Sequence, residues 1–169
     1  MTGKQLGMLA AGGSAILLLA AFVFQALGYA PCAMCIWQRY PHGVAIATGA
    51  LLAVGLSPIG LMVIGVAAAA TTSAIGVYHT GVERDWWQGP TSCTGSGLDL
   101  SNLSGSDLLP SASSGPSTLV MCDEVAWEFL TLSMASWNAL WSAALVGLWL
   151  LAFARERQNR QAQITYSAT

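Results

Sequence analysis

Four long apolar runs alternate with polar connections along this chain, at about residues 6–27, 35–56, 59–79 and 135–153. As a helix rising 1.5 Å per residue, the first run reaches about 33 Å, which is enough to cross the hydrocarbon core of a bilayer. Glycine and alanine recur in all four runs, as in helices that pack closely within lipid. The pattern predicts an all-α membrane protein, a bundle of four transmembrane helices that forms a single domain over residues 1–169.

The first run has a second interpretation, as a cleaved signal peptide, because Gly28-Tyr29-Ala30 resembles a small-residue cleavage site. Pro31 would follow the cut directly, which is a poor position for a peptidase, and three more apolar runs come after it. We therefore expect the first run to remain as a membrane span.

The connections between the runs differ greatly in size. A tight Ser57-Pro58 turn joins the second and third runs, whereas loops at residues 28–34 and 81–134 join the other neighbours. The middle of the longer loop, residues 89–117, is rich in glycine, serine and proline, a composition typical of a poorly ordered segment.

The last part of the long loop has the pattern of a short helix. Asp123 is a good N-cap with an acidic residue directly behind it. Val125, Phe129 and Leu132 follow at helical spacing on one face. We predict a short amphipathic helix here, lying on the membrane surface.

The placement of charge predicts the topology. Charged residues make up only 8% of the chain, against roughly 25% in soluble domains, and the net charge of -2 gives nucleic-acid binding no electrostatic basis. Lys4 lies near the N-terminus and Arg155, Arg157 and Arg160 lie near the C-terminus, whereas seven of the eight acidic residues fall at positions 83–128. Because lysine and arginine favour cytoplasmic flanks, we predict cytoplasmic termini and two loops that face the periplasm.

All four cysteines, Cys32, Cys35, Cys93 and Cys122, fall in the two outward-facing segments, where disulfides persist. Four cysteines allow three pairings. Cys32 and Cys35 can bond only each other without a long reach, which leaves Cys93 and Cys122 as the second pair. The sequence therefore predicts two disulfide pairs on one side of the membrane.

Three kinds of chemistry compete for these thiols. The disulfides could be structural staples, or the four thiolates could form a zinc site. We expect no metal, because a second closely spaced pair is missing and the compartment is oxidising. A disulfide that closes a two-residue loop stabilises little and is strained, and strained, accessible disulfides are the reactive ones. Redox exchange is therefore the favoured interpretation.

The residues that follow the first pair support redox chemistry. Pro31 places Cys32 at the start of a helix, where free N–H groups favour a thiolate. Cys35, Arg39 and His42 then share one face of that helix. Arg39 either snorkels to the membrane interface or stabilises the Cys35 thiolate and donates to a polar ligand head.

A disulfide that oxidises other thiols has to be re-oxidised in turn. The sequence contains no fingerprint for flavin, haem or nucleotide binding. A membrane quinone is an acceptor that a thiol embedded in lipid can reach. His79, at the outward end of the third run, either caps a helix or packs in the core, or it faces the same quinone site as Cys35 and Arg39.

The sequence resembles the DsbB family of disulfide bond formation proteins, in particular its proteobacterial members. The likeness covers nearly the whole chain apart from the termini and the middle of the long loop. The matching residues are Pro31-Cys32-Ala33-Met34-Cys35-Ile36-Trp37-Gln38-Arg39, Tyr78-His79 with Gly81-Val82-Glu83, Trp86-Trp87-Gln88-Gly89-Pro90 before Cys93, and Cys122-Asp123-Glu124 with Trp127 and Phe129-Leu130.

The resemblance implies an electron route. Cys93 exchanges with a periplasmic thioredoxin-fold thiol oxidase of the DsbA type, and Cys122 is its partner in the loop disulfide. Electrons pass to Cys32–Cys35, and Cys35 hands them to ubiquinone, or alternatively to menaquinone, with Arg39 holding the quinone. The chain is then expected to be a protein-disulfide:quinone oxidoreductase of the bacterial inner membrane that sustains disulfide formation in exported proteins.

Two other hypotheses fit part of the pattern. A structural membrane protein with two inert disulfides would have the same spans and cysteines. A quinone-linked thiol oxidoreductase of the vitamin K epoxide reductase type is also a helical bundle with a Cys-x-x-Cys motif. There the motif follows the loop pair, whereas here Cys32 and Cys35 come first. His42 and residues 101–117 match no motif of the DsbB family.

Overall fold

Four α-helices account for most of the computed structural model, which describes residues 1–56, 58–90 and 121–167. The four predicted helices are therefore present, with ends that differ from the predicted ones by a few residues, except that the last helix continues well past position 153. Their bounds are Gly3–Ala26 for α1, Ala33–Ala53 for α2, Pro58–Glu83 for α3 and Met134–Ser167 for α4.

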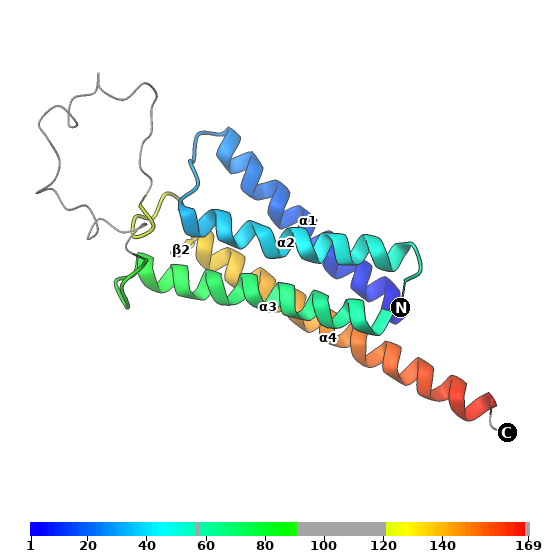
Figure 1. Cartoon of the computed structure of the whole chain (residues 1–169). Coiled ribbons are helices and arrows are strands. Elements are labelled where there is room, and N and C mark those ends of the chain that lie inside the picture. The colour runs from blue at the N-terminus through cyan, green and yellow to red at the C-terminus, as the bar shows by residue number, and fades with distance from the viewer. Residues whose placement is uncertain (57, 91–120, 168–169) are drawn as a thin grey trace, which may run out of the picture.

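Successive helices run in opposite directions. Both termini lie at one end of the bundle, and the ends of α1 and α3 and the starts of α2 and α4 lie at the other end (Figure 1). Each helix packs mainly against two neighbours, so that α1 and α3 face each other diagonally with little contact. The bundle therefore brings the first loop and the end of the long loop together.

Three of the four helices are long and apolar enough to cross a membrane. Over their most apolar windows, α1, α3 and α4 have mean hydropathies of 2.2, 1.8 and 1.5. The chain is thus a multi-pass membrane protein with three candidate spans among its described residues. Helix α2 is the more polar member because Gln38, Arg39, Pro41 and His42 lie in its first half.

Small residues let the helices approach closely at the end of the bundle that carries the termini. A core of Ala10, Ala11, Leu52, Met62, Ala69, Leu145, Trp149 and Ala152 fills the centre there. Gly65 of α3 lies flat against the Trp149 indole of α4, and a Cβ atom at position 65 would lie 2.5 Å from its ring atoms. Close packing of this kind is what holds helices together within lipid.

The segment before α4 forms a hairpin, so the predicted short helix is wrong. Strand β1 (Glu128–Phe129) pairs antiparallel with β2 (Leu132–Ser133), and the turn residues Leu130 and Thr131 have φ values of 53° and 63°. The helical spacing of the apolar residues here is a local signal. Bonds from distant parts of the chain override it.

Those bonds occupy the carbonyls that a helix would use. The Trp137 indole N–H of α4 donates to the Phe129 carbonyl at 3.1 Å, and the Arg84 guanidinium donates to the Thr131 carbonyl at 3.1 Å. The Ser133 hydroxyl donates to the Glu83 carboxylate at the end of α3. The hairpin is therefore fastened to both flanking helices. Ser57 and residues 91–120, which include Cys93 and most of the segment predicted to be poorly ordered, lie outside the described residues.

Candidate redox site

Cys32 and Cys35 lie at the start of α2, at the loop-bearing end of the bundle. Cys32 is the N-cap of the helix, and its sulfur accepts a hydrogen bond from the Cys35 backbone N–H at 3.3 Å. The Cys32 S–H donates to the Cys35 sulfur across 3.2 Å. Because a disulfide bond is about 2.05 Å long, a small rotation brings these sulfurs to bonding distance.

Cys32 holds its proton tightly. The hydrogen bond to Cys35, together with burial, raises the pKa of Cys32 to about 12, and the side chain is only 4% exposed. The placement of Cys32 at the helix N-terminus was predicted correctly, but the expected thiolate was not. The N–H contact exists, yet the proton shared with Cys35 and the loss of solvent outweigh it.

His79 reaches the pair from the end of α3. Its Nε2 atom lies 3.5 Å from the Cys32 sulfur and 3.9 Å from a carboxylate oxygen of Glu83, one helical turn further on. The side chains of His79 and Glu83 are both buried. The two sulfurs and the imidazole nitrogen all lie within 4.8 Å of one another. His79 is thus a direct neighbour of Cys32. The sequence had linked it to Cys35 and Arg39 instead.

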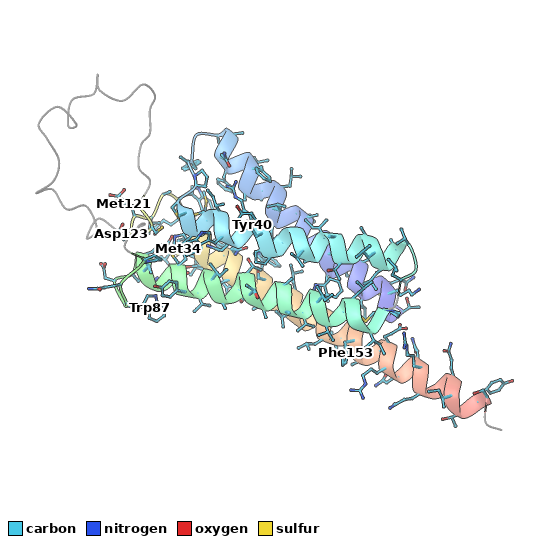
Figure 2. The ribbon with its side chains drawn as sticks, in the orientation of Figure 1. Met34, Tyr40, Trp87, Met121, Asp123 and Phe153 are labelled. Atoms are coloured by element: carbon cyan, nitrogen blue, oxygen red, sulfur yellow. The ribbon has the colours of Figure 1, made fainter. Side chains whose placement is uncertain are left out.

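Cys122 joins the same site from the segment that precedes the hairpin. It is fully buried in a cluster with Cys32, Met34 and Val82. Figure 2 shows its two neighbours, Met121 and Asp123, at the same end of the bundle as Met34. One member of the predicted second pair therefore packs beside the first pair, although the two are far apart in sequence.

Two amide side chains, Gln38 and Asn138, hold the His79 ring in place. The Gln38 side-chain amide donates to His79 Nδ1 at 3.0 Å and to the Met34 carbonyl at 3.2 Å. Asn138 of α4 donates to the Gln38 side-chain oxygen at 2.6 Å. Because Nδ1 accepts, the proton of a neutral His79 lies on Nε2 and faces Cys32.

The same chain continues deeper into the bundle to His42. Its Nε2 atom lies 2.9 Å from the Asn138 oxygen and 3.3 Å from the Thr72 hydroxyl, and the ring is 3% exposed. Within the described residues, His42 Nδ1 has no hydrogen-bond partner. His42, which the sequence linked only to a helical face, is thus connected to His79 through two amide side chains.

Arg39 connects α2 to α1. Its guanidinium donates to the Gln25 side-chain oxygen at 2.7 Å and to the Ala21 carbonyl at 3.4 Å, and it lies over the Phe22 ring. The Nε–H group is buried, and no acceptor for it occurs in the described parts of the chain. One donor of Arg39 thus remains for a ligand.

Sequence reasoning missed the amide side chains, although a signal for them exists. The predicted apolar runs contain three amides, Gln25, Gln38 and Asn138, and each of them bonds to Arg39, His79 or His42. A polar side chain within a span is unfavourable unless it has a partner, so it marks a functional position. The partners could not be named because they lie on other helices.

A cavity of about 440 Å³ opens beside these groups. Cys35, Arg39 and His42 line it together, as their spacing on one helical face predicted, and Cys32 and His79 reach it as well. Its walls are otherwise largely apolar and aromatic, formed by Leu17, Phe24, Tyr29, Trp127, Trp137 and Trp141 among others. Apolar walls with a few convergent polar groups are typical of a site for a small organic ligand.

Comparison with known proteins gives matches over most of the chain. The family described as disulfide bond formation protein DsbB matches residues 3–152, a range that includes all four cysteine positions. The chain belongs to the DsbB family. Disulfide bond formation protein B of Aromatoleum aromaticum is 32% identical to it over 141 residues, which cover 80% of this chain and 82% of the relative. The comparison with solved structures gave no match.

Membership of the DsbB family confirms the resemblance that the sequence suggested. It implies a role in disulfide bond formation and an oxidoreductase activity. Three of the four cysteines lie in the described part of the chain, at the same end of the bundle.

Proposed function

We propose that this DsbB-family chain re-oxidises a periplasmic thiol oxidase of the DsbA type and passes the electrons to a membrane quinone. The observation that carries the proposal is the burial of Cys122 in one cluster with Cys32, beside an apolar cavity that Cys35 and Arg39 line. A loop cysteine, a helix-end pair and a ligand cavity are thereby joined in one site.

Each exchange step breaks one S–S bond and forms another. A thiolate of the reduced partner attacks Cys93 in the Cys93–Cys122 disulfide, and the partner's second thiol then closes its own disulfide. The reduced loop pair attacks in turn: Cys122 bonds to Cys32 and Cys35 leaves as a thiolate. Cys93 then restores the loop disulfide and releases Cys32. Two electrons have moved to the Cys32–Cys35 pair.

The cavity residues fit a quinone head group. A bound quinone supplies an acceptor for two electrons and two protons. In this chain, the Nε–H of Arg39 has no acceptor among the described residues and is suited to donate to a carbonyl oxygen, and the aromatic walls exclude water from the ring. Cys35 lines the cavity and is the sulfur that the exchange releases. Ubiquinone is the proposed acceptor, with menaquinone as the alternative.

The proposed location is the bacterial inner membrane, with all four helices as spans and both termini in the cytoplasm. In support, the termini share one end of the bundle (Figure 1), and Arg155, Arg157 and Arg160 lie on the part of α4 at that end. The cysteine site lies at the opposite end. This charge distribution follows the preference of basic residues for the cytoplasmic side.

Anaerobic turnover of the purified chain tests the proposal. Reduced DsbA-type partner and a soluble ubiquinone or menaquinone analogue are mixed with the chain, and quinone reduction is followed by absorbance. Cys35→Ser should abolish quinone reduction, and Cys93→Ser should stop turnover with the partner while quinone still binds. A structural protein with inert disulfides is the competing hypothesis, and it predicts no quinone-dependent loss of partner thiols in any variant.

A further inference from the structure

Cys32 and Cys35 at the start of α2 and His79 near the end of α3 offer the ligand atoms of a metal site. The sulfurs of Cys32 and Cys35 and Nε2 of His79 lie within 4.8 Å of one another, and Cys32 and His79 are buried. Two thiolates and an imidazole are ligands that zinc and other thiophilic cations prefer. We propose that the reduced Cys32–Cys35 pair, together with His79, binds a thiophilic cation such as Zn²⁺.

The observed separations are close to those of a zinc site. In a tetrahedral zinc site, the metal lies about 2.3 Å from sulfur and about 2.0 Å from nitrogen. Two sulfur ligands are then about 3.8 Å apart, and a sulfur and a nitrogen ligand are about 3.5 Å apart. The Cys32 sulfur lies 3.5 Å from His79 Nε2 and 3.2 Å from the Cys35 sulfur. The sulfur pair has to open by about 0.6 Å, and the Cys35 sulfur has to lie about 3.5 Å from His79 Nε2, which it already approaches to within 4.8 Å. A rotation of the half-buried Cys35 side chain adjusts both separations.

A cation can reach these ligands through the cavity, because all three residues line it. Binding replaces the two thiol protons, which are released to water, and changes no oxidation state. The cavity leaves the fourth position for a water molecule, as in zinc sites with three protein ligands. The buried Glu83 carboxylate, 3.9 Å from His79 Nε2, adds negative charge beside the cation.

The site exists only when the pair is reduced, since a Cys32–Cys35 disulfide has no thiolate to offer. Under the proposed function, a bound cation competes with re-oxidation and holds the chain in its reduced form. The metal site itself needs neither quinone nor partner. The sequence argued against metal because a second closely spaced cysteine pair is missing, but the fold supplies His79 as a third ligand from another helix.

A substitution at Gln38 should change the affinity for the metal ion. When Nε2 binds a metal, the ring proton must move to Nδ1, where Gln38 now donates. The amide has to turn its oxygen toward Nδ1 and give up the bond to the Met34 carbonyl. A carboxylate at position 38 accepts from Nδ1 without this rearrangement. Because such partners of a metal-binding histidine change affinity by about 10–100-fold, Gln38→Glu should tighten binding about tenfold.

Anaerobic titration with Co²⁺ tests the proposal on the full chain with Cys93→Ala and Cys122→Ala, which removes the other two thiols. The reduced chain should bind one Co²⁺ with a thiolate charge-transfer band and tetrahedral visible bands, and one equivalent of Zn²⁺ should remove both. His79→Ala should weaken binding at least tenfold. Thr71→Ala, whose exposed hydroxyl donates to the Ala67 carbonyl of the same helix, is the control and should keep the affinity. The chain with an oxidised Cys32–Cys35 pair should show no bands.

Three results would overturn the metal site. They are equal affinity in the His79→Ala chain, equal binding by the oxidised chain, and no bands from a reduced chain that keeps its helical circular dichroism. If the double cysteine variant loses that dichroism, Cys32→Ser and Cys35→Ser in the otherwise unchanged chain replace it. Each of these two variants should lack the Co²⁺ bands, because the site requires both thiolates and His79. Full Co²⁺ binding by either variant contradicts the proposal. None of these results bears on quinone turnover, so the metal site and the proposed function fail separately.

Discussion

The sulfur of Cys32 and Nε2 of His79 lie 3.5 Å apart, although one residue caps α2 and the other lies near the end of α3. Gln38 donates to the other ring nitrogen, so the N–H of a neutral His79 points at the sulfur. That donor stabilises negative charge on Cys32 when an exchange step releases it. Under the proposed function, His79 therefore acts on Cys32 during disulfide exchange.

Replacing His79 should slow disulfide exchange more than it disturbs folding. We expect His79→Ala to reduce the rate of exchange between the two cysteine pairs by about 100-fold, the lower end of the range for a positioned proton donor. Acid quenching followed by mass spectrometry of the trapped disulfides measures this rate. His79→Gln, which keeps an N–H donor, should recover part of it. An unchanged rate in the alanine variant would show that the donor does not act on Cys32.

The raised pKa of Cys32 predicts an unusual pH dependence of alkylation. With a pKa of about 12, against an ordinary value of 9.0, Cys32 is almost fully protonated at neutral pH. Its thiolate fraction, and therefore its alkylation rate, should rise about tenfold per pH unit without levelling off by pH ~10. Mass spectrometry of chains labelled with iodoacetamide gives the rate for each cysteine.

Cys35→Ala removes the hydrogen bond that is the largest cause of this shift. Alkylation of Cys32 in that variant should level off at a lower pH than in the unchanged chain. If both chains reach a plateau at the same pH, the hydrogen bond to Cys35 does not control Cys32.

The helices and the position of the first cysteine pair could be predicted because both follow from local patterns. Apolar runs define α1, α3 and α4, and Pro31 before Cys32 marks the start of α2. The hairpin could not be predicted, because the bond from Trp137 to the Phe129 carbonyl is decided by tertiary structure. The links from Gln38 to His79 and Asn138 cross three helices and leave no trace in the spacing of residues.

Arg39→Lys should weaken quinone use. Lysine keeps the charge but lacks the Nε–H, which is buried and unpaired among the described residues, and it has no planar group to bind Gln25 and Ala21 together. We expect the apparent KM for quinone to rise about tenfold with the loss of one charge-assisted hydrogen bond. Arg84→Lys is the matched control, because Arg84 contacts Thr131 and Trp86 away from the cavity. Equal KM values in the two variants would remove Arg39 from the site.

Gly65→Ala should destabilise the bundle. The new Cβ would lie 2.5 Å from ring atoms of Trp149, which is fully buried and cannot move aside. Overpacking of this kind typically lowers the free energy of unfolding by about 1–3 kcal/mol. Gly60→Ala in the same helix meets no atom within 4 Å and should leave stability unchanged or raise it by up to about 1 kcal/mol. Thermal unfolding in detergent compares the two, and a similar shift in both would mean that the Trp149 contact is not close in solution.

Helix α2 should cross the membrane even though it is not among the three candidate spans. Its polar residues Gln38 and His42 are buried and bonded to other helices, whereas Trp37, Tyr40 and Val44 are exposed toward the surroundings. Average hydropathy counts both faces equally, but lipid meets only the exposed face, and paired polar groups inside a bundle are tolerated.

Reporter fusions decide whether α2 spans the membrane. A fusion after Leu56, in the α2–α3 connection, should be active only as a cytoplasmic reporter, and fusions at Gly28 and Pro90 should be active only as periplasmic ones. If α2 did not cross, the fusions after Gly28 and Leu56 would report the same side. Periplasmic activity at Leu56 would then place the α2–α3 turn with the cysteines, and the termini could no longer share the cytoplasm. The charge pattern favours the crossing, since Lys4 and the three arginines of α4 lie at the end of the bundle where α2 ends.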